Sequence, residues 1–119
     1  MNVLIRNTSN IFFIFAISHL IIWTLVPSVT NQNLPLDTIE AIAWGSNLDW
    51  GFNKHPPMSA FFSKIFFLIF GSQDWAYYIL SQIFVLVAFY YVFRFAREIL
   101  NNIKLSIISV LLLESIYFY

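Results

Sequence analysis

Residues 11–30 read IFFIFAISHLIIWTLVPSVT, and this stretch decides the class of fold. Residues 11–26 are almost wholly apolar, and an apolar run of about 20 residues can cross the roughly 30 Å hydrocarbon core as a helix. Pro27 stands near the end of the run, where a spanning helix tolerates it. A cleaved signal peptide with Val26 and Ser28 at its cleavage site is the rival interpretation. The further apolar blocks downstream favour a multispanning protein.

The composition agrees with a membrane protein. Of the 119 residues, 60% are hydrophobic, 20% are aromatic and only 10% are charged, whereas about 25% of the residues in soluble domains are charged. The net charge is zero and the few cations are spread out, so the chain has no field to hold nucleic acid. The absence of cysteine excludes disulfides, thiolate metal sites and cysteine nucleophiles.

Two further apolar blocks predict two more membrane spans. Residues 75–97, which begin WAYYILSQIFVLVAFYYVFRF, carry Trp and Tyr at their ends and two arginines at the second end, a pattern typical of a helix with that end in the cytoplasm. Residues 105–119, LSIISVLLLESIYFY, begin a third span that stops part-way. We therefore expect an all-α integral membrane protein with about three transmembrane helices, the third one truncated, and a missing C-terminal part of the same protein.

A shorter block, residues 58–70, reads MSAFFSKIFFLIF and carries Lys64. About 13 residues suit an interfacial helix better than a span. The loop at residues 71–74 has no Lys or Arg, and the next cations come only at the far end of the second span. The positive-inside rule then places the N-terminus in the cytoplasm, and residues 31–74 form an outer loop with juxtamembrane helices.

Most of the candidate chemistry lies in residues 34–58, LPLDTIEAIAWGSNLDWGFNKHPPM. Asp37 and Glu40 are three residues apart, so on a helix they share a face, which Ala41 and Trp44 continue. One carboxylate can take a hydroxyl proton, the second can orient it or hold a divalent cation, and an indole can cover the apolar face of a sugar. The same spacing fits a capping box with Asp37 as N-cap, which starts a helix without any other function. Spacing alone leaves both interpretations open.

The other end of this segment reads Lys54-His55-Pro56-Pro57. Two prolines fix an extended approach and rigidly present the cation and the imidazole that precede them. This arrangement suits phosphate at headgroup depth, with Lys54 as a point charge and His55 as a donor. A snorkelling lysine and a histidine in a turn fit equally well. Trp50 supplies a second indole between the two polar groups.

Two ionisable residues fall inside apolar blocks, His19 in the first and Glu114 in the third. Intramembrane ionisable groups can belong to ion pathways, so a transporter fragment is a weak alternative. A neutral imidazole hydrogen-bonded to a neighbouring helix is the more common role of such a histidine, and His19 is therefore not a candidate site residue.

The order of these features resembles the N-terminal part of the polytopic, C-type glycosyltransferases. The resemblance is to glycosyltransferase family 39 and its bacterial relatives, related to protein O-mannosyltransferases and lipid A aminoarabinose transferases. It is carried by LPLDTIEAIAWG (34–45), LDWGFNKHPPMSAFF (48–62), FGSQDWAYYILSQ (70–82) and YVFRFAREIL (91–100).

This resemblance implies a polyprenyl-phosphate-linked sugar donor and an acceptor hydroxyl on the non-cytoplasmic side of the inner (plasma) membrane. It implies that Asp37 is the catalytic base or orients the acceptor, and that Glu40 supports it or shares a divalent cation. Lys54 and His55 would contact the lipid phosphate. Many relatives have the two acids adjacent, whereas two residues separate them here, so which acid acts stays open. These enzymes also have many more spans and a large outer domain.

One alternative is of another class. The chain could be a small, non-catalytic membrane protein whose polar loop clamps membrane lipid at the interface or binds a partner protein.

Overall fold

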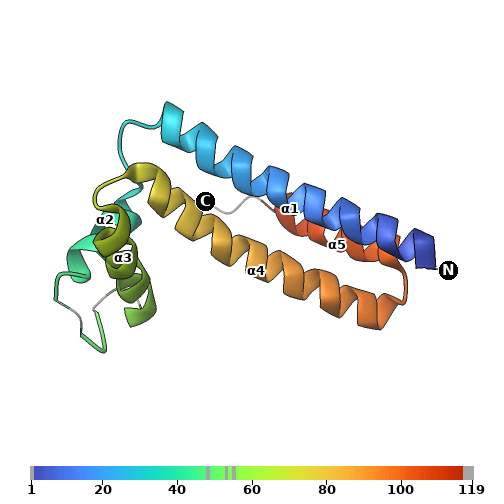
Figure 1. Ribbon diagram of the computed structural model, residues 1–119. Coiled ribbons are helices and arrows are strands. Elements are labelled where there is room, and N and C mark those ends of the chain that lie inside the picture. The colour runs from blue at the N-terminus through green and yellow to red at the C-terminus, as the bar shows by residue number, and fades with distance from the viewer. Residues whose placement is uncertain (1, 48, 53, 55, 117–119) are drawn as a thin grey trace. The chain divides into compact units, whose positions relative to one another are not determined.

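All regular secondary structure in the part of the chain that the structure describes is helical. The computed structural model describes residues 2–47, 49–52, 54 and 56–116, which contain five helices and no strand (Figure 1). This confirms the predicted all-α class. The helices are α1 (Asn2–Thr30), α2 (Leu36–Trp44), α3 (Pro57–Phe70), α4 (Asp74–Leu100) and α5 (Ile103–Glu114). The chain divides into two compact units. One consists of Met1–Ile21 with Ile83–Tyr119, and the other of Ile22–Gln82, so the boundaries fall within α1 and α4.

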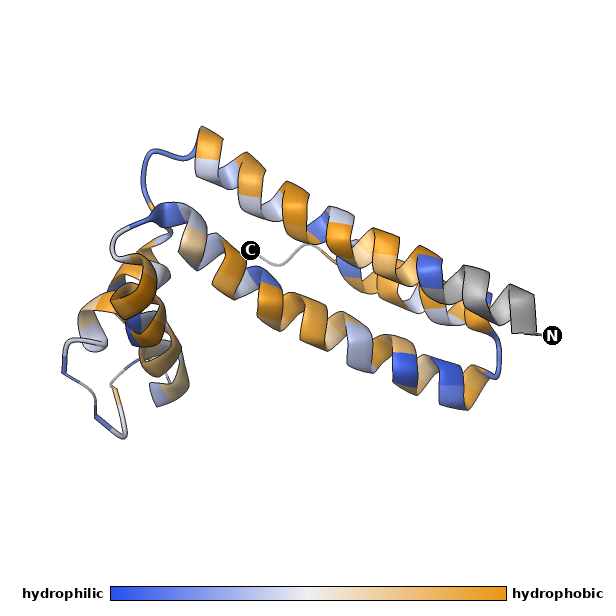
Figure 2. Cartoon of the chain, in the orientation of Figure 1, coloured by the Kyte–Doolittle hydropathy of each residue, from blue (hydrophilic) through white to orange (hydrophobic). Residues whose placement is uncertain are grey.

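Two of these helices are long and apolar enough to cross a membrane, namely α4 and the Asn10–Thr30 part of α1. Figure 2 shows hydrophobic residues along most of both helices and hydrophilic residues in the turns that follow them. They coincide with the first and second predicted spans. Helix α5 has 12 residues, about 18 Å at 1.5 Å per residue, which is short of a crossing. The count of three spans therefore stays a prediction.

Helix α3 has 14 residues and is apolar, but it is too short for the same test. Pro56 is its N-cap and Pro57 its first residue, a position where proline costs nothing because that N–H has no helical partner. The helix ends at Phe70. The next residue, Gly71, has a φ of 65°, which glycine adopts easily because it has no Cβ. These bounds match the predicted short helix, and its position at the membrane surface stays a prediction.

A two-residue turn joins α4 to α5. Asn101 adopts a positive φ of 47°, a conformation that asparagine tolerates better than most residues. The Asn102 side-chain oxygen then accepts the backbone N–H groups of Lys104 (3.0 Å) and Leu105 (3.3 Å) and so caps α5. The two adjacent asparagines therefore separate α4 from α5.

The first unit is built around an aromatic core. Phe12 of α1, Phe89 and Phe93 of α4, and Val110 of α5 form one buried cluster. The rings of Phe12 and Phe93 stack with centroids 4.5 Å apart and planes 16° apart. Ser106 is fully buried on α5, and its hydroxyl donates to the Asn102 carbonyl at 2.9 Å. Burying these groups against one another holds the three helices side by side, as Figure 1 shows.

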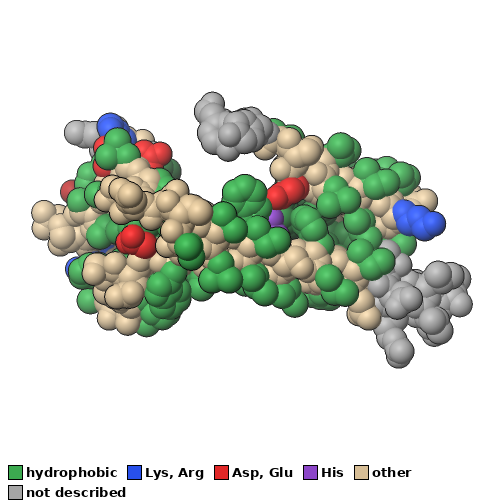
Figure 3. All heavy atoms as spheres, turned by 90° about the horizontal axis from the view of Figure 1, so that it is seen from above, with side chains coloured by type: hydrophobic (Ala, Val, Ile, Leu, Met, Phe, Trp, Pro, Cys, Tyr) green, Lys and Arg blue, Asp and Glu red, His purple; other side chains and the backbone are tan. Residues whose placement is uncertain are grey.

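His19 and Glu114 meet inside this same unit. His19 is only 8% exposed, and its Nδ1 lies 3.2 Å from Glu114 Oε1. Its ring also makes an edge-to-face contact with Phe89, with centroids 5.0 Å apart. Figure 3 shows an acidic and a histidine side chain together on a face that is otherwise mostly hydrophobic. The imidazole thus contacts a neighbouring helix, which is the role that the sequence favoured for His19.

The second unit packs α2 against α3 through small residues. Ala41, Ala60 and Ser63 are buried between the two helices. A Cβ added at Gly45 would lie 3.1 Å from the Ala60 carbonyl oxygen and 3.1 Å from Lys64 Cβ. Small residues let two helix backbones approach closely. The acid-bearing helix is therefore fixed against the helix that follows the two prolines.

Candidate functional site

The two predicted acids lie on α2, but not as a capping box. Pro35 is the N-cap of the helix and makes no side-chain cap bond, and its carbonyl accepts the N–H groups of Thr38 and Ile39. Asp37 therefore lies inside the first turn rather than before it, and the capping-box interpretation is wrong. The helix begins before Asp37 because the ring of Pro35 fixes its φ, here −52°, at a value that suits an N-cap residue. An acid in the first turn still complements the helix dipole.

Glu40 forms an ion pair with Lys54. The Lys54 Nζ lies 3.0 Å from Glu40 Oε1 and 3.4 Å from Oε2. The lysine side chain is 63% exposed and the glutamate side chain 25% exposed. The structure thus brings together two residues that the sequence assigned to opposite ends of one site, and it gives Glu40 a partner that the sequence had not predicted.

Aromatic contacts hold the connecting loop in place. The rings of Trp44 and Phe52 stack with centroids 5.3 Å apart and planes 11° apart. Trp50 meets Phe61 of α3 edge-to-face at 5.9 Å and is still 86% exposed. Phe52 therefore covers one face of the Trp44 indole, and that face is closed to a sugar. The sequence reasoning missed Phe52 and Phe61, since nothing in their spacing marks them as partners of the two tryptophans.

Two further predictions concern His55 and a divalent cation. His55 lies outside the described residues. A divalent cation shared by Asp37 and Glu40 would have to compete with Lys54 for the Glu40 carboxylate. Among the residues whose placement is described, no group of three or more His, Cys, Asp or Glu side chains could hold a metal ion.

Residues 54–119 match the sequence profile of a family described as dolichyl-phosphate-mannose-protein mannosyltransferase. The chain belongs to this family. No curated protein and no solved structure gives a significant match. Membership confirms the predicted resemblance to glycosyltransferase family 39. Together with the two long apolar helices, it makes the chain a membrane protein of a glycosyltransferase family.

The part of this mannosyltransferase-family chain that matches the profile begins at Lys54 and contains α3, α4 and α5. The cation of the candidate site is therefore inside the matched segment, whereas Asp37 and Glu40 precede it. The ion pair from Lys54 to Glu40 links the matched segment to the acid-bearing helix, in addition to the packing of α2 on α3.

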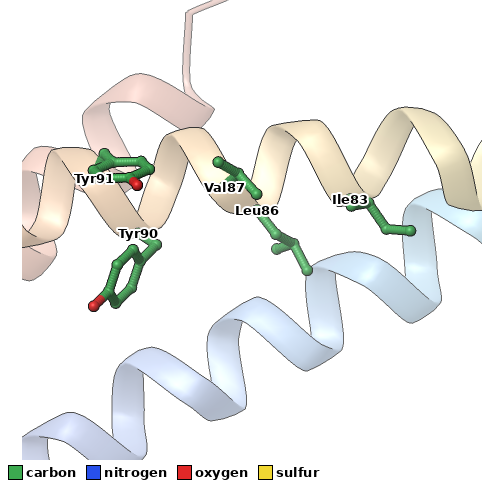
Figure 4. Close-up of a pocket in the computed structure, with 5 residues that line it drawn as sticks. All are labelled: Ile83, Leu86, Val87, Tyr90 and Tyr91. Carbon is green, nitrogen blue, oxygen red and sulfur yellow. The ribbon is translucent and has the colours of Figure 1, made fainter. Parts of the chain in front are cut away.

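Two of the hollows on the described surface differ in their chemistry. One, of about 390 Å³, runs along α4 and is lined by Ile83, Leu86, Val87, Tyr90 and Tyr91 (Figure 4). Its lining has no carboxylate, histidine or cation, so it offers an apolar packing surface rather than acid–base chemistry. The other, of about 460 Å³, lies beside the candidate site and is lined by Asp49, Trp50, Phe61, Lys64, Ile65 and Leu68.

Proposed function

We propose that this chain forms part of the site of a glycosyltransferase that moves a sugar from a polyprenyl-phosphate donor to an acceptor hydroxyl. The reaction would take place on the non-cytoplasmic side of the inner (plasma) membrane. Family membership supports sugar transfer from a lipid-linked donor. The observation that carries the proposal is the contact between Glu40 and Lys54. It brings the cation that we propose to bind the donor phosphate to α2, on which Asp37 lies one turn before Glu40.

In this reaction the acceptor oxygen attacks the anomeric carbon and the bond from that carbon to the phosphate oxygen breaks. The acceptor proton goes to a carboxylate, and the lipid phosphate leaves with the bonding electrons. Asp37 is the proposed base. It lies in the first turn of α2, and side chains three residues apart on a helix have Cβ atoms about 5–6 Å from each other. A positioned base contributes about 10²- to 10⁴-fold to the rate.

Lys54 is the proposed partner of the leaving phosphate. A lipid phosphate is already a good leaving group, so the protein mainly has to position it and offset its charge. The exposed ion pair with Glu40 is cheap to break, because such pairs contribute about 0–1 kcal/mol. Lys54 can therefore exchange the Glu40 carboxylate for a phosphate oxygen. His55 would assist at the same phosphate, and Trp50 would cover the sugar.

The decisive experiment replaces Asp37 by Asn and measures transfer from a radiolabelled polyprenyl-phosphate sugar in proteoliposomes. We expect transfer to fall by about 10²- to 10⁴-fold with normal expression. Asp74→Asn is the matched control, because Asp74 is also a first-turn acid, in α4, and its loss costs only about 0.3–1 kcal/mol of helix stability. Near-normal transfer by Asp37→Asn would remove this residue from the catalytic role.

Lys54→Ala tests the donor end of the site. The variant should weaken use of the lipid-phosphate donor more than use of the acceptor, since the lost cation faces only the phosphate. An equal loss of activity toward donor and acceptor would show that Lys54 stabilises the folded protein and does not bind the donor phosphate.

A further inference from the structure

A hollow on the outer face of α3 has the composition of a lipid-binding groove. Its volume of about 460 Å³ lies within the roughly 300–1,000 Å³ of small-molecule sites. Four hydrophobic side chains line it, Trp50, Phe61, Ile65 and Leu68. Two of them are strongly exposed, Trp50 at 86% and Leu68 at 72%. Contiguous exposed apolar surface of this kind marks a binding site, and in a membrane protein lipid is the natural apolar ligand.

Two opposite charges stand on the lining of this groove, Lys64 and Asp49. Lys64 is the only charged residue of α3, and its Nζ lies 5.9 Å from the centre of the Phe67 ring. Asp49 uses Oδ1 to accept the backbone N–H of Trp50 at 2.7 Å, which orients its carboxylate. The groove thus combines an apolar lining with one cation and one anion.

These charges select among lipid headgroups. A cation alone would favour an anionic lipid, but such a lipid would bring its phosphate near the Asp49 carboxylate. A headgroup with both a phosphate and a primary ammonium matches both charges, because the ammonium can donate hydrogen bonds to a carboxylate. A quaternary choline headgroup is attracted to Asp49 by its charge, but it has no N–H to donate and forms no hydrogen bond with the carboxylate.

We propose that this groove binds one phospholipid of the phosphoethanolamine class. The phosphate contacts Lys64 Nζ, the ammonium contacts the Asp49 carboxylate, and an acyl chain lies along Phe61, Ile65 and Leu68. The Trp50 indole lies at the edge, where an amphipathic ring is stable at the membrane interface. The groove shares Trp50 with the proposed sugar site, but its two charges, Lys64 and Asp49, have no part in the proposed sugar transfer.

The test measures quenching of tryptophan fluorescence by lipids with brominated acyl chains. The protein is reconstituted into phosphatidylcholine vesicles that contain brominated phosphatidylethanolamine, phosphatidylglycerol or phosphatidylcholine, each at the same fraction. Trp50→Phe, measured in parallel, identifies the part of the signal that comes from Trp50. We expect Trp50 quenching to favour phosphatidylethanolamine by about 2- to 5-fold over the other two lipids, the size expected of one exposed ion contact.

Two variants assign the charges. Asp49→Asn should abolish the preference for phosphatidylethanolamine over phosphatidylcholine, whereas Lys64→Gln should lower quenching by all three lipids. Equal quenching by the three lipids in the unaltered protein, or a preference that survives Asp49→Asn, would overturn the proposal. Displacement of brominated phosphatidylethanolamine by an equal amount of a polyprenyl phosphate would also overturn it, because the groove would then belong to the sugar donor.

Discussion

Replacing Glu40 by Gln separates a positioning role of this residue from a catalytic one. Glu40 contacts Lys54 at 3.0 Å with side chains 25% and 63% exposed, and an ion pair this exposed contributes at most about 1 kcal/mol. If the donor phosphate competes with Glu40 for Lys54, the variant should lower the donor KM by no more than about 5-fold and leave kcat nearly unchanged. If Glu40 were the base, kcat would fall by about 10²- to 10⁴-fold.

The assay is initial-rate transfer in proteoliposomes, with the polyprenyl-phosphate sugar varied at saturating acceptor. Lys54→Met keeps an unbranched side chain as far as Cε and removes the charged ammonium group, so the donor KM should rise by about 10- to 150-fold, the worth of a hydrogen bond to a charged group. The double variant should behave like Lys54→Met alone, because Glu40 acts through Lys54. A loss of kcat in Glu40→Gln, or an unchanged donor KM in Lys54→Met, would refute this reasoning.

Other predictions test the helices that carry the site and their topology. Gly45→Val should lower the yield of folded protein in detergent, because a Cβ there comes within 3.1 Å of two atoms of α3; a normal yield would contradict the close packing. A double-mutant cycle of His19→Phe and Glu114→Gln should give a coupling energy of about 0.6–1.7 kcal/mol in unfolding titrations, and additive effects would show that the two side chains do not stabilise each other. Asn102→Ala removes the cap of α5 and should cost about 1 kcal/mol in the same titrations. The chain has no cysteine, so Asn47→Cys should be labelled from outside intact cells by an impermeant maleimide; protection there would reverse the proposed topology.

The long helices could be predicted because their signal is local. The apolar runs at residues 11–30 and 75–97 are long enough for a bilayer crossing, and this can be recognised without knowledge of the tertiary structure. The α4–α5 turn was predictable for the same reason, since Asn101 and Asn102 favour it by their own chemistry. The start of the short helix α3 was likewise predictable, because Pro56 and Pro57 favour an N-cap and a first helical position.

The contacts within the candidate site were not predictable, because they join residues that are distant in sequence. Glu40 and Lys54 are 14 positions apart, and their pairing depends on the close approach of α2 to α3 at Gly45. The capping-box interpretation failed because spacing alone cannot tell an N-cap from a first-turn residue. Pro35 decided that question because it is itself the N-cap, so the helix begins at Leu36, one residue before Asp37.

The contact between His19 and Glu114 has a consequence for how these two positions evolve. An acid left without a partner in an apolar setting costs about 2.5–3.5 kcal/mol at the centre of a membrane helix, so losing the histidine first would penalise the chain. Substitutions at these two positions should therefore be inherited together across related proteins, either as a His–Glu pair or as two apolar residues. A lineage that kept only the acid would need a new donor on another helix, and its sequence would show where that donor arose.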